Sequence, residues 1–345
     1  MAQTMELPEV SETFSDAQRE DLFERVRQAE QRLAGKARPT PLLSLDALAA
    51  NGGGAGVAVK CENLQHTGAF KFRGAYNALT ALRDAGSAEN GVLTYSSGNH
   101  GQALAMAGAM LGIEVTVVMP SNVPAVKREA TEARGAKIVQ YDPATTRREA
   151  LGAQLAAERG LPIIPPYDHL DVIGGQATVG LEILKQAPDV ARILVCTGGG
   201  GLLSGIATAV AMSESNCQVI GVEPALADDA TRSFRSKRLC WVDNPPTIAD
   251  GTRTPFLGQH TFPVVMNLVH DMVTVSEDAI MQGMRLLFRQ AKLVVEPSGA
   301  LGTAALIEGA VGPLAPDQGR TVAVISGGNV DASLFAAVLE GRPLP

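Results

Sequence analysis

The chain has 345 residues, of which 46% are hydrophobic and 19% charged, so it can bury a large core and form about two globular domains. Its formal net charge of −7 argues against nucleic acid as the main partner, because phosphate backbones are bound by basic surfaces. The four cysteines form no CxxC pair, so we expect no disulfide framework. The sequence shows neither a signal peptide nor an apolar run long enough to span a membrane, so we expect a cytoplasmic protein.

The first elements expected along the chain are a helix, an extended connector and a strand. Ser15-Asp16-Ala17-Gln18 has the pattern of a capping box, which predicts a helix to about residue 34. Two prolines in residues 38–42 favour an extended connector, because a residue that precedes proline is disfavoured in a helix. An apolar run then predicts a strand at 57–61.

Strands and helices alternate from residue 91 onward. This alternation predicts an α/β fold in which helices cover a mostly parallel sheet. Strands are expected at 91–95, 114–119, 138–140, 161–164, 192–196, 219–222 and 321–325, and helices at 124–134, 145–159, 175–185, 278–292 and 298–309.

One lysine lies between two aromatic residues, in Thr67-Gly68-Ala69-Phe70-Lys71-Phe72-Arg73-Gly74. A solvated lysine, with a pKa of about 10.4, is a poor nucleophile at neutral pH. Apolar neighbours favour its uncharged form, which makes Lys71 a candidate for forming a Schiff base. The alternative is a surface lysine whose aliphatic stem packs on Phe70 and Phe72.

Three polar or glycine-rich loops follow expected strands. Because ligands bind beyond the carboxyl ends of strands in open α/β sheets, the loops 96–101, 197–202 and 326–329 are candidates for one common site.

The glycines 198–201 lie between a strand and a helix, where converging N–H groups can bind a phosphate. Their spacing fits neither GxGxxG nor a P-loop, and the alternative is a tight turn.

The loop Ser96-Ser97-Gly98-Asn99-His100-Gly101 could hold a carboxylate at a helix N-terminus. It could also be an ordinary helix cap. His100 could act as a general base, but a single histidine can equally be a structural residue.

A further acidic loop contains Glu223, Asp228 and Asp229. Carboxylates and a backbone carbonyl are ligands suited to Mg²⁺ or Ca²⁺, whereas the alternative is a solvated acidic loop.

Together these motifs resemble the fold-type II pyridoxal phosphate enzymes, and among them the serine/threonine dehydratase and serine racemase family. The resemblance extends from about Thr40 to Asp331. It implies a tryptophan synthase β-like fold with two open, twisted, mostly parallel sheets flanked by helices. It also implies a large cofactor-binding domain (1–89 and 169–345), a small mobile domain (90–168) and a homodimer.

The resemblance implies a role for each motif around pyridoxal 5'-phosphate. Lys71 would form the Schiff base and move the α-proton, Phe70 would back the pyridine ring, and Asn99 would bind the ring hydroxyl. The ring nitrogen would meet Ser326, whose neutral hydroxyl makes the ring a milder electron sink. The phosphate would be held by Gly198, Gly199, Gly200, Gly201 and Leu202.

The resemblance also implies substrate and metal residues. The substrate carboxylate would be bound by Ser96, Ser97, Asn99 and His100, with Arg147 reaching it on domain closure. A divalent cation, Mg²⁺ or else Ca²⁺ or Mn²⁺, would be held by Glu223, the Ala227 carbonyl and Asp229. One position departs from the animal serine racemases, which have an asparagine where this chain has Tyr167.

The activity implied is the dehydration of a 3-hydroxy amino acid such as L-threonine, L-serine or 3-hydroxyaspartate. The alternative is a serine or aspartate-type racemase, in which Lys71 and Ser97 exchange protons with opposite faces of the substrate. Ser97 favours some racemase activity, since simple mammalian serine dehydratases have alanine there. A protein that binds an amino acid or phosphate without catalysis is a third possibility, and it would lack an internal imine.

Overall fold

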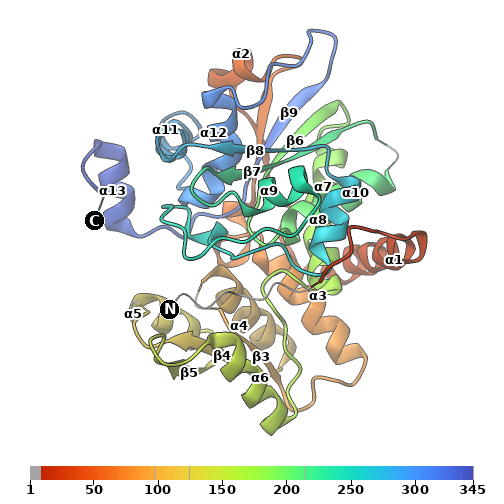
Figure 1. Cartoon of the computed structure of the whole chain (residues 1–345), viewed down its shortest axis with the longest axis vertical. Helices are drawn as coiled ribbons and strands as arrows, with labels where there is room; N and C mark the ends of the chain where they lie inside the picture. Colours follow the sequence, from red (N-terminus) through yellow and green to blue (C-terminus); the bar gives the residue numbers. More distant parts are fainter. Residues whose placement is uncertain (1–8, 97, 124, 214, 345) are drawn as a thin grey trace.

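The computed structural model describes residues 9–96, 98–123, 125–213 and 215–344 of the chain. These residues form two lobes, a larger upper one and a smaller lower one in the view of Figure 1. In the described part of the chain, no helix combines the length and the apolar composition needed to cross a bilayer.

The upper lobe contains a six-stranded sheet in which only the first strand is antiparallel to its neighbour. The central position of β9 is visible in its register, since Ala323 lies opposite both Val59 and Leu194. In spatial order the strands are β1 (Leu42–Ser44), β2 (Val57–Cys61), β9 (Arg320–Ile325), β6 (Val190–Cys196), β7 (Gln218–Pro224) and β8 (Asp271–Val275).

The lower lobe contains a parallel sheet of three strands, β3 (Val92–Thr94), β4 (Val115–Pro120) and β5 (Lys137–Tyr141). Leu93 of β3 also pairs with Ile163 in an isolated bridge. This sheet lies within the range predicted for the small domain, and the domain boundaries themselves stay a prediction.

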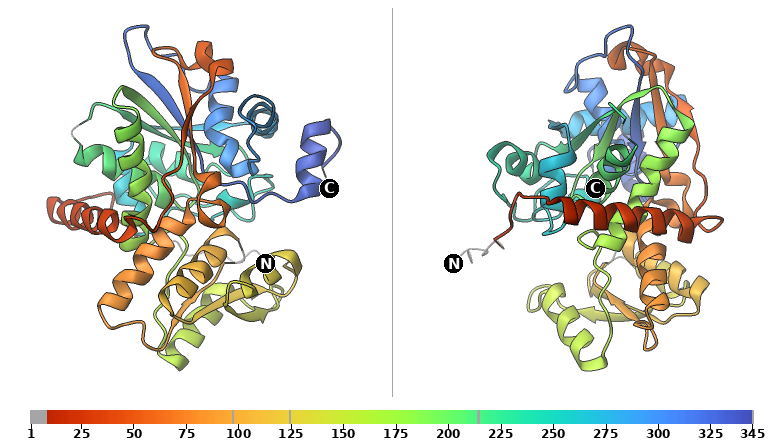
Figure 2. Two further views of the ribbon diagram at one scale, coloured as in Figure 1. Left: turned by 180° about the vertical axis from the view of Figure 1, so that it is seen from behind. Right: turned by 90° about the vertical axis from the view of Figure 1, so that its right-hand side faces the viewer.

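Helices cover both faces of the large sheet, which explains why its inner strands are continuous apolar runs. Figure 2 shows α1 and α13 at opposite sides of the upper lobe. The helices are α1 (Asp16–Leu33), α2 (Ala49–Gly52), α3 (Lys71–Asp84), α4 (Asn99–Leu111), α5 (Ala125–Glu132), α6 (Arg148–Arg159), α7 (Leu170–Gln186), α8 (Gly201–Met212), α9 (Asp229–Ser236), α10 (Thr261–Leu268), α11 (Glu277–Leu286), α12 (Leu301–Glu308) and α13 (Ala332–Glu340).

The helix α3 links the two lobes. Its apolar residues Phe72 and Leu79 belong to the core of the lower lobe, together with Val92 of β3 and Val115 of β4. The same helix packs against α7 of the upper lobe and α4 of the lower lobe. The residue that begins α3, Lys71, therefore lies where the two lobes meet.

The structure confirms the capping box, in which the Ser15 hydroxyl accepts from Gln18 N–H and the Gln18 side chain accepts from Ser15 N–H. Other boundaries were predicted wrongly. The helix expected at 175–185 already begins at Leu170, because the His169 side chain accepts from Asp171 N–H and caps its first turn. The sequence analysis did not predict the edge strands β1 and β8, because their residues are only partly buried and lack a long apolar run. Residues 161–164 form a single bridge instead of a strand.

Candidate functional site

A cavity of about 380 Å³ contains most of the residues expected at the site. Motifs from distant parts of the chain line it, as expected from their places after strands and before helices. The predicted residues that line this cavity are Phe70, Lys71, Ser96, Asn99, His100, Gly198, Gly199, Gly200, Gly201, Leu202 and Ser326. Ser97 lies outside the described residues.

The amine of Lys71 is placed at the N-terminal end of α3, inside the cavity. Its Nζ donates a hydrogen bond to the Pro166 carbonyl at 2.7 Å and lies 4.9 Å from the centre of the Phe70 ring. Burial lowers the pKa of Lys71 to about 8, although Cys196 and Glu296 oppose this shift. A substantial fraction of the amine is therefore neutral and nucleophilic near physiological pH.

The glycine loop presents backbone N–H groups without acceptors. Within the described residues, no hydrogen bond is donated by the N–H groups of residues 198–202. The loop leads into α8, whose N-terminal end adds positive potential, and Gly200 adopts a φ of +87° that favours glycine. A Cβ on Gly199 would lie 2.3 Å from the Tyr167 ring, so this ring packs directly on the loop. The loop is suited to an anionic group.

Asn99 is held in place from both sides. Its Nδ2 donates to the two carboxylate oxygens of Glu296 at 2.9 and 3.2 Å, and its Oδ1 accepts from Asn329 Nδ2 at 2.8 Å. Asn329 also donates to the Thr67 carbonyl, which anchors the network beside the lysine-bearing segment. The sequence analysis does not identify Glu296 as a residue of the site. The sequence feature that could have identified it is the segment Glu-Pro-Ser-Gly-Ala at 296–300. This segment is a glycine-containing turn that follows an apolar run, as the other loops of the site do.

The buried ring of His100 is neutral. Its Nε2 lies 3.1 Å from the Ile164 carbonyl, an oxygen that can only accept, so Nε2 carries the proton. Burial and then the nearby charge of Lys71 lower the pKa of His100 to about 3. Nδ1 has no hydrogen-bond partner among the described residues.

Ser326 lies at the end of β9, beside the lysine-bearing segment. Its carbonyl accepts from Phe70 N–H at 3.0 Å, and the next residue, Gly327, pairs with Ala69 in an isolated bridge. These backbone contacts fix the lysine-bearing segment against the central strand of the large sheet.

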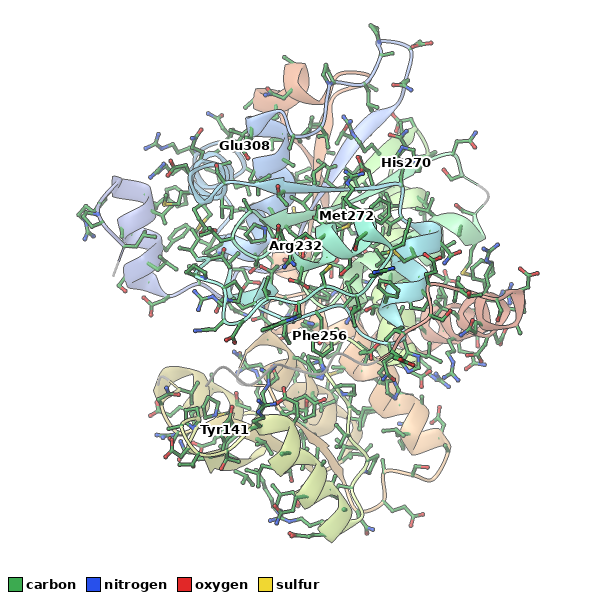
Figure 3. The ribbon with its side chains drawn as sticks, in the orientation of Figure 1. Tyr141, Arg232, Phe256, His270, Met272 and Glu308 are labelled. Carbon is green, nitrogen blue, oxygen red and sulfur yellow. The ribbon has the colours of Figure 1, made fainter. Side chains whose placement is uncertain are left out.

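The lower lobe contributes an arginine next to the one expected. Arg148 lines the cavity, whereas Arg147, the residue before α6, is exposed and lies outside the cavity lining. Tyr95 and Tyr167 line the same wall, and the Tyr167 hydroxyl donates a long hydrogen bond of 3.5 Å to the Phe256 carbonyl. Phe256 is labelled in Figure 3, at the lower edge of the upper lobe.

The acidic loop forms a separate buried cluster. Glu223 at the end of β7 accepts from the N–H groups of Ala230 and Thr231 and from the Thr231 hydroxyl. Burial and then the charge of Asp229 raise the pKa of Glu223. Burial raises the pKa of Asp229 to about 7, and its Oδ2 has no partner among the described residues. An unpaired buried carboxylate oxygen fits a cation ligand, although no group of three or more His, Cys, Asp or Glu suited to a metal occurs in the described part of the chain.

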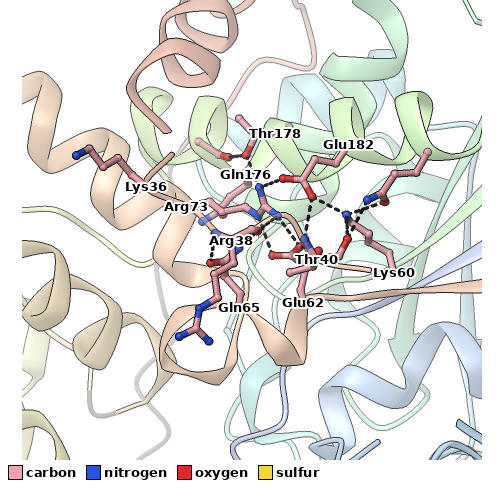
Figure 4. A network of polar contacts seen from close by, with 12 residues as sticks. Lys36, Arg38, Thr40, Lys60, Glu62, Gln65, Arg73, Gln176, Thr178 and Glu182 are labelled. Carbon is pink, nitrogen blue, oxygen red and sulfur yellow. Dashed lines mark hydrogen bonds and ion pairs between the residues drawn. The ribbon is translucent and has the colours of Figure 1, made fainter. Parts of the chain in front are cut away.

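A buried charge network supports the lysine-bearing helix (Figure 4). The Arg73 guanidinium, 1% exposed, donates to both carboxylate oxygens of Glu62 at 2.8 Å and to Glu182 at 2.7 Å. Lys60 donates to the other Glu182 oxygen at 2.6 Å. Because Glu62 directly follows β2 and Glu182 belongs to α7, the network ties α3 to two elements of the upper lobe.

The model of the family described as pyridoxal-phosphate dependent enzyme matches residues 33–327. The chain belongs to this family. The resemblance inferred from the four motifs, and the α/β fold that it implies, are thereby confirmed.

Similar proteins within the family carry two kinds of name. The L-threo-3-hydroxyaspartate ammonia-lyase of a Pseudomonas species is 43% identical to this enzyme over 317 residues, covering 92% of this chain and 98% of its own. The serine racemase of Schizosaccharomyces pombe is 40% identical and covers 92% and 97%. The structure of maize serine racemase superimposes with a TM-score of 0.82 at 35% identity and covers 92% and 97%.

The residues of the cavity fit pyridoxal phosphate, the cofactor of this family. The loop at 198–202 offers donors without acceptors for a phosphate, and Lys71 offers an amine with a lowered pKa in the same cavity. Asn99 and Ser326 supply an amide and a hydroxyl from two further walls.

Proposed function

We propose that this enzyme eliminates water from a 3-hydroxy amino acid such as L-threonine, L-serine or 3-hydroxyaspartate. The resulting enamine leaves and tautomerises to an imine, which water hydrolyses to a 2-oxo acid and ammonia. The observation that carries the proposal is the shared cavity of the Lys71 amine, with its pKa of about 8, and the unpaired N–H groups of residues 198–202. The ammonia-lyase name of the Pseudomonas relative supports the same reaction.

Each residue has a defined role in the proposed reaction. When bound, pyridoxal phosphate supplies an aldehyde for covalent attachment to an amine and a ring that withdraws electrons from the substrate α-carbon. Backbone N–H groups of residues 198–202 would hold the phosphate, while Asn99 and Ser326 would orient the ring. Phe70 would back the ring. The Lys71 amine takes the α-proton, for which it must be uncharged.

The substrate carboxylate is proposed to bind at the N-terminal end of α4. The N–H groups of Asn99, His100 and Gly101 have no acceptor within the described residues, and the helix dipole favours an anion there. Ser96 lines the same part of the cavity, and Ser97 is included by resemblance alone. The neutral His100 would contribute its backbone N–H, because the low pKa of its ring excludes a charged imidazolium near neutral pH.

A screen for ammonia release tests this proposal. The purified enzyme loaded with pyridoxal phosphate is incubated with L-serine, D-serine, L-threonine, D-threonine, phenylserine and the isomers of 3-hydroxyaspartate. We expect ammonia and the matching 2-oxo acid from at least one L-hydroxy amino acid, and none from the variant Lys71→Ala. A protein that binds these amino acids but releases no ammonia from any of them contradicts the proposal.

Racemisation is the second candidate function, favoured by the 40% identity to a serine racemase. It requires a second acid or base on the face opposite Lys71, for which Ser97 is the candidate from sequence. Incubation with L-serine, followed by measurement of pyruvate against D-serine, separates the two reactions. We expect pyruvate to dominate, and the variant Ser97→Ala to remove any D-serine formation while keeping measurable pyruvate formation.

We propose in addition that Glu223, Asp229 and the Ala227 carbonyl hold a divalent cation, with Mg²⁺ as the first candidate. The unpaired Asp229 oxygen and the two raised carboxyl pKa values support it, because a cation would compensate two buried charges. The double variant Glu223→Ala/Asp229→Ala should lose any stabilisation by Mg²⁺ in thermal unfolding. If a chelator affects the wild type and this variant equally, the loop does not bind a cation.

We propose a cytoplasmic homodimer with a mobile small domain at 90–168. The free thiols of its four cysteines fit a reducing compartment, and the exposed apolar residues Leu64, Phe288 and Val294 fit a covered interface. Light scattering of the purified protein tests whether it is a dimer. Cell fractionation tests its cytoplasmic location. Hydrogen exchange with and without substrate tests the mobility of the small domain. A monomer at micromolar concentration contradicts the dimer.

A further inference from the structure

We propose that Asn329 is a positioning residue for the cofactor. It fixes the side-chain amide of Asn99 in the orientation that presents an N–H donor to the ring hydroxyl of pyridoxal phosphate. Asn329 lines the cavity at the end of the loop 326–329, but it has no role of its own in the proposed reaction. The inference rests on the proposed function, because it assumes the role given there to Asn99.

The orientation of an asparagine amide decides which group it can bind. One edge of the amide carries two N–H donors, and the other edge is an oxygen that only accepts. A ring hydroxyl that has lost its proton needs a donor, so Asn99 has to turn Nδ2 toward it and Oδ1 away from it. Because the two edges have nearly the same shape, only hydrogen-bond partners can select one orientation.

A chain of hydrogen bonds selects this orientation from both ends. At one end, the carboxylate of Glu296 accepts from Asn99 Nδ2 at 2.9 and 3.2 Å. At the other end, the Thr67 carbonyl, which can only accept, lies 2.7 Å from Asn329 Nδ2. The second proton of Asn329 Nδ2 is then donated to Asn99 Oδ1 at 2.8 Å. A reversed Asn99 amide would place an oxygen against the carboxylate and a donor against a donor.

The backbone around Gly68 holds Asn329 in the position that this chain requires. The N–H of Gly328 donates to the Gly68 carbonyl at 2.9 Å. A Cβ on Gly68 would lie 2.7 Å from Asn329 Oδ1, and Gly68 adopts a φ of +74° that favours glycine. The segment before Lys71 is therefore shaped to receive the Asn329 side chain.

The chain of hydrogen bonds crosses from one lobe to the other. Asn99 begins α4 of the lower lobe, whereas Asn329 follows β9 and Glu296 precedes α12 in the upper lobe. The upper lobe thus offers an acceptor to one edge of the Asn99 amide and a donor to the other edge. The amide can bind between them in one orientation, which leaves the donor edge on the side of Glu296.

The test compares two cofactors that differ by the ring hydroxyl. Pyridoxal phosphate has this hydroxyl and 3-deoxypyridoxal phosphate lacks it, while both keep the aldehyde and the phosphate. The apoenzyme is titrated with each cofactor, followed by absorbance, and the ratio of the two Kd values is the readout. For the wild type we expect pyridoxal phosphate to bind more tightly by about 10-fold or more, the effect of a hydrogen bond to a charged group. A variant that only damages the fold weakens both cofactors and leaves the ratio unchanged.

Single variants locate the effect. Asn329→Leu removes the donor without adding a charge and should lower the ratio by about 3-fold or more, the effect of losing one hydrogen bond. Asn329→Asp should lower it further, because two carboxylates then compete for Asn99 Nδ2. Asn99→Ala gives the complete loss for comparison. Asn63→Asp is the matched control and should keep the ratio, because Asn63 also donates from Nδ2 to a backbone carbonyl, that of Val294, but lies outside the cavity lining.

The double variant Asn329→Asp/Glu296→Gln separates hydrogen bonding from orientation. It moves the carboxylate from one end of the chain to the other and leaves the net charge unchanged. The new glutamine can donate to Asn99 Oδ1 and the new aspartate can accept from Nδ2, so the hydrogen bonds of Asn99 are restored with its amide reversed. We expect thermal unfolding of the apoenzyme to recover toward the wild type relative to Asn329→Asp, whereas the cofactor ratio stays low.

The outcomes separate this inference from the proposed function. A ratio that Asn99→Ala lowers but that Asn329→Leu and Asn329→Asp leave unchanged overturns this inference alone. A ratio that Asn99→Ala leaves unchanged overturns the proposed role of Asn99 and this inference with it. Recovery of the ratio in the double variant, or an equal loss in Asn63→Asp, also overturns the inference. The ratio is measured without substrate, so an enzyme that releases no ammonia leaves the test valid.

Discussion

The two walls of the cavity are built in different ways. The wall from the upper lobe consists largely of backbone donors and short turns at the ends of β6 and β9, tied together by buried contacts. The wall from the lower lobe carries side chains at the surface of a smaller sheet, among them Tyr95 and Arg148. The upper wall therefore offers mainly backbone donors, whereas the lower wall offers mainly side chains.

The largest expected difference is in stability, between the buried charge network that supports α3 from the upper lobe and the cavity-lining Arg148 of the lower lobe. Arg73→Met removes a buried guanidinium, which leaves Glu62 without an ion-pair partner and Glu182 paired with Lys60 alone, and should lower the free energy of unfolding by about 3–5 kcal/mol. Arg148→Met removes a solvent-exposed ion pair with Glu149 and should cost less than about 1 kcal/mol. Urea unfolding of both variants checks the difference. Similar losses would contradict the expectation that the buried charge network stabilises the fold more than the Arg148–Glu149 ion pair does.

The second prediction concerns the cofactor side of the upper wall. A Cβ in Gly199→Ala would overlap the Tyr167 ring, displace the loop and weaken binding of pyridoxal phosphate by about 1–3 kcal/mol, or roughly 5- to 150-fold. Titration of the apoenzyme with pyridoxal phosphate, followed by absorbance, measures this loss. The double variant Gly199→Ala/Tyr167→Ala should recover part of the affinity because the overlapping ring is gone. No recovery would show that the overlap is not the cause.

A further effect is expected at the acidic loop, outside the cavity. The pKa of Asp229, about 7 in the folded protein, lies above its ordinary value of 3.8. The folded state therefore binds this proton more tightly, and stability falls as pH rises from about 4 to 7. In the presence of a chelator, the wild type should lose at most about 1.4 kcal/mol per pH unit over this range, and Asp229→Asn should lose less. Thermal unfolding at several pH values checks this, and equal slopes would contradict it.

The sequence predicts the upper wall better than the lower one. A glycine loop between a strand and a helix has a fixed backbone geometry, so its position and its donors follow from local sequence. The lysine between Phe70 and Phe72 is a candidate from its immediate neighbours, and the other motifs of the chain decide against a surface lysine. The inner strands β2, β6, β7 and β9 are recognisable as continuous apolar runs.

The residues that the sequence does not predict depend on contacts across the chain or on helix phase. Glu296 enters the site through Asn99, which is 197 positions away in sequence. Neighbouring residues of a helix point about 100° apart, so one residue of uncertainty in the start of α6 decides between Arg147 and Arg148. The edge strand β8 has partly buried residues and no strong apolar pattern.

The covalent state of Lys71 tests the central claim most directly. The enzyme as purified is treated with borohydride, digested and analysed by mass spectrometry. We predict an absorbance band of an imine before reduction, and afterwards a pyridoxyl-phosphate adduct on the peptide that contains Lys71. An adduct on another lysine, or unmodified Lys71 in protein saturated with pyridoxal phosphate, would contradict the assignment of this cavity as the active site.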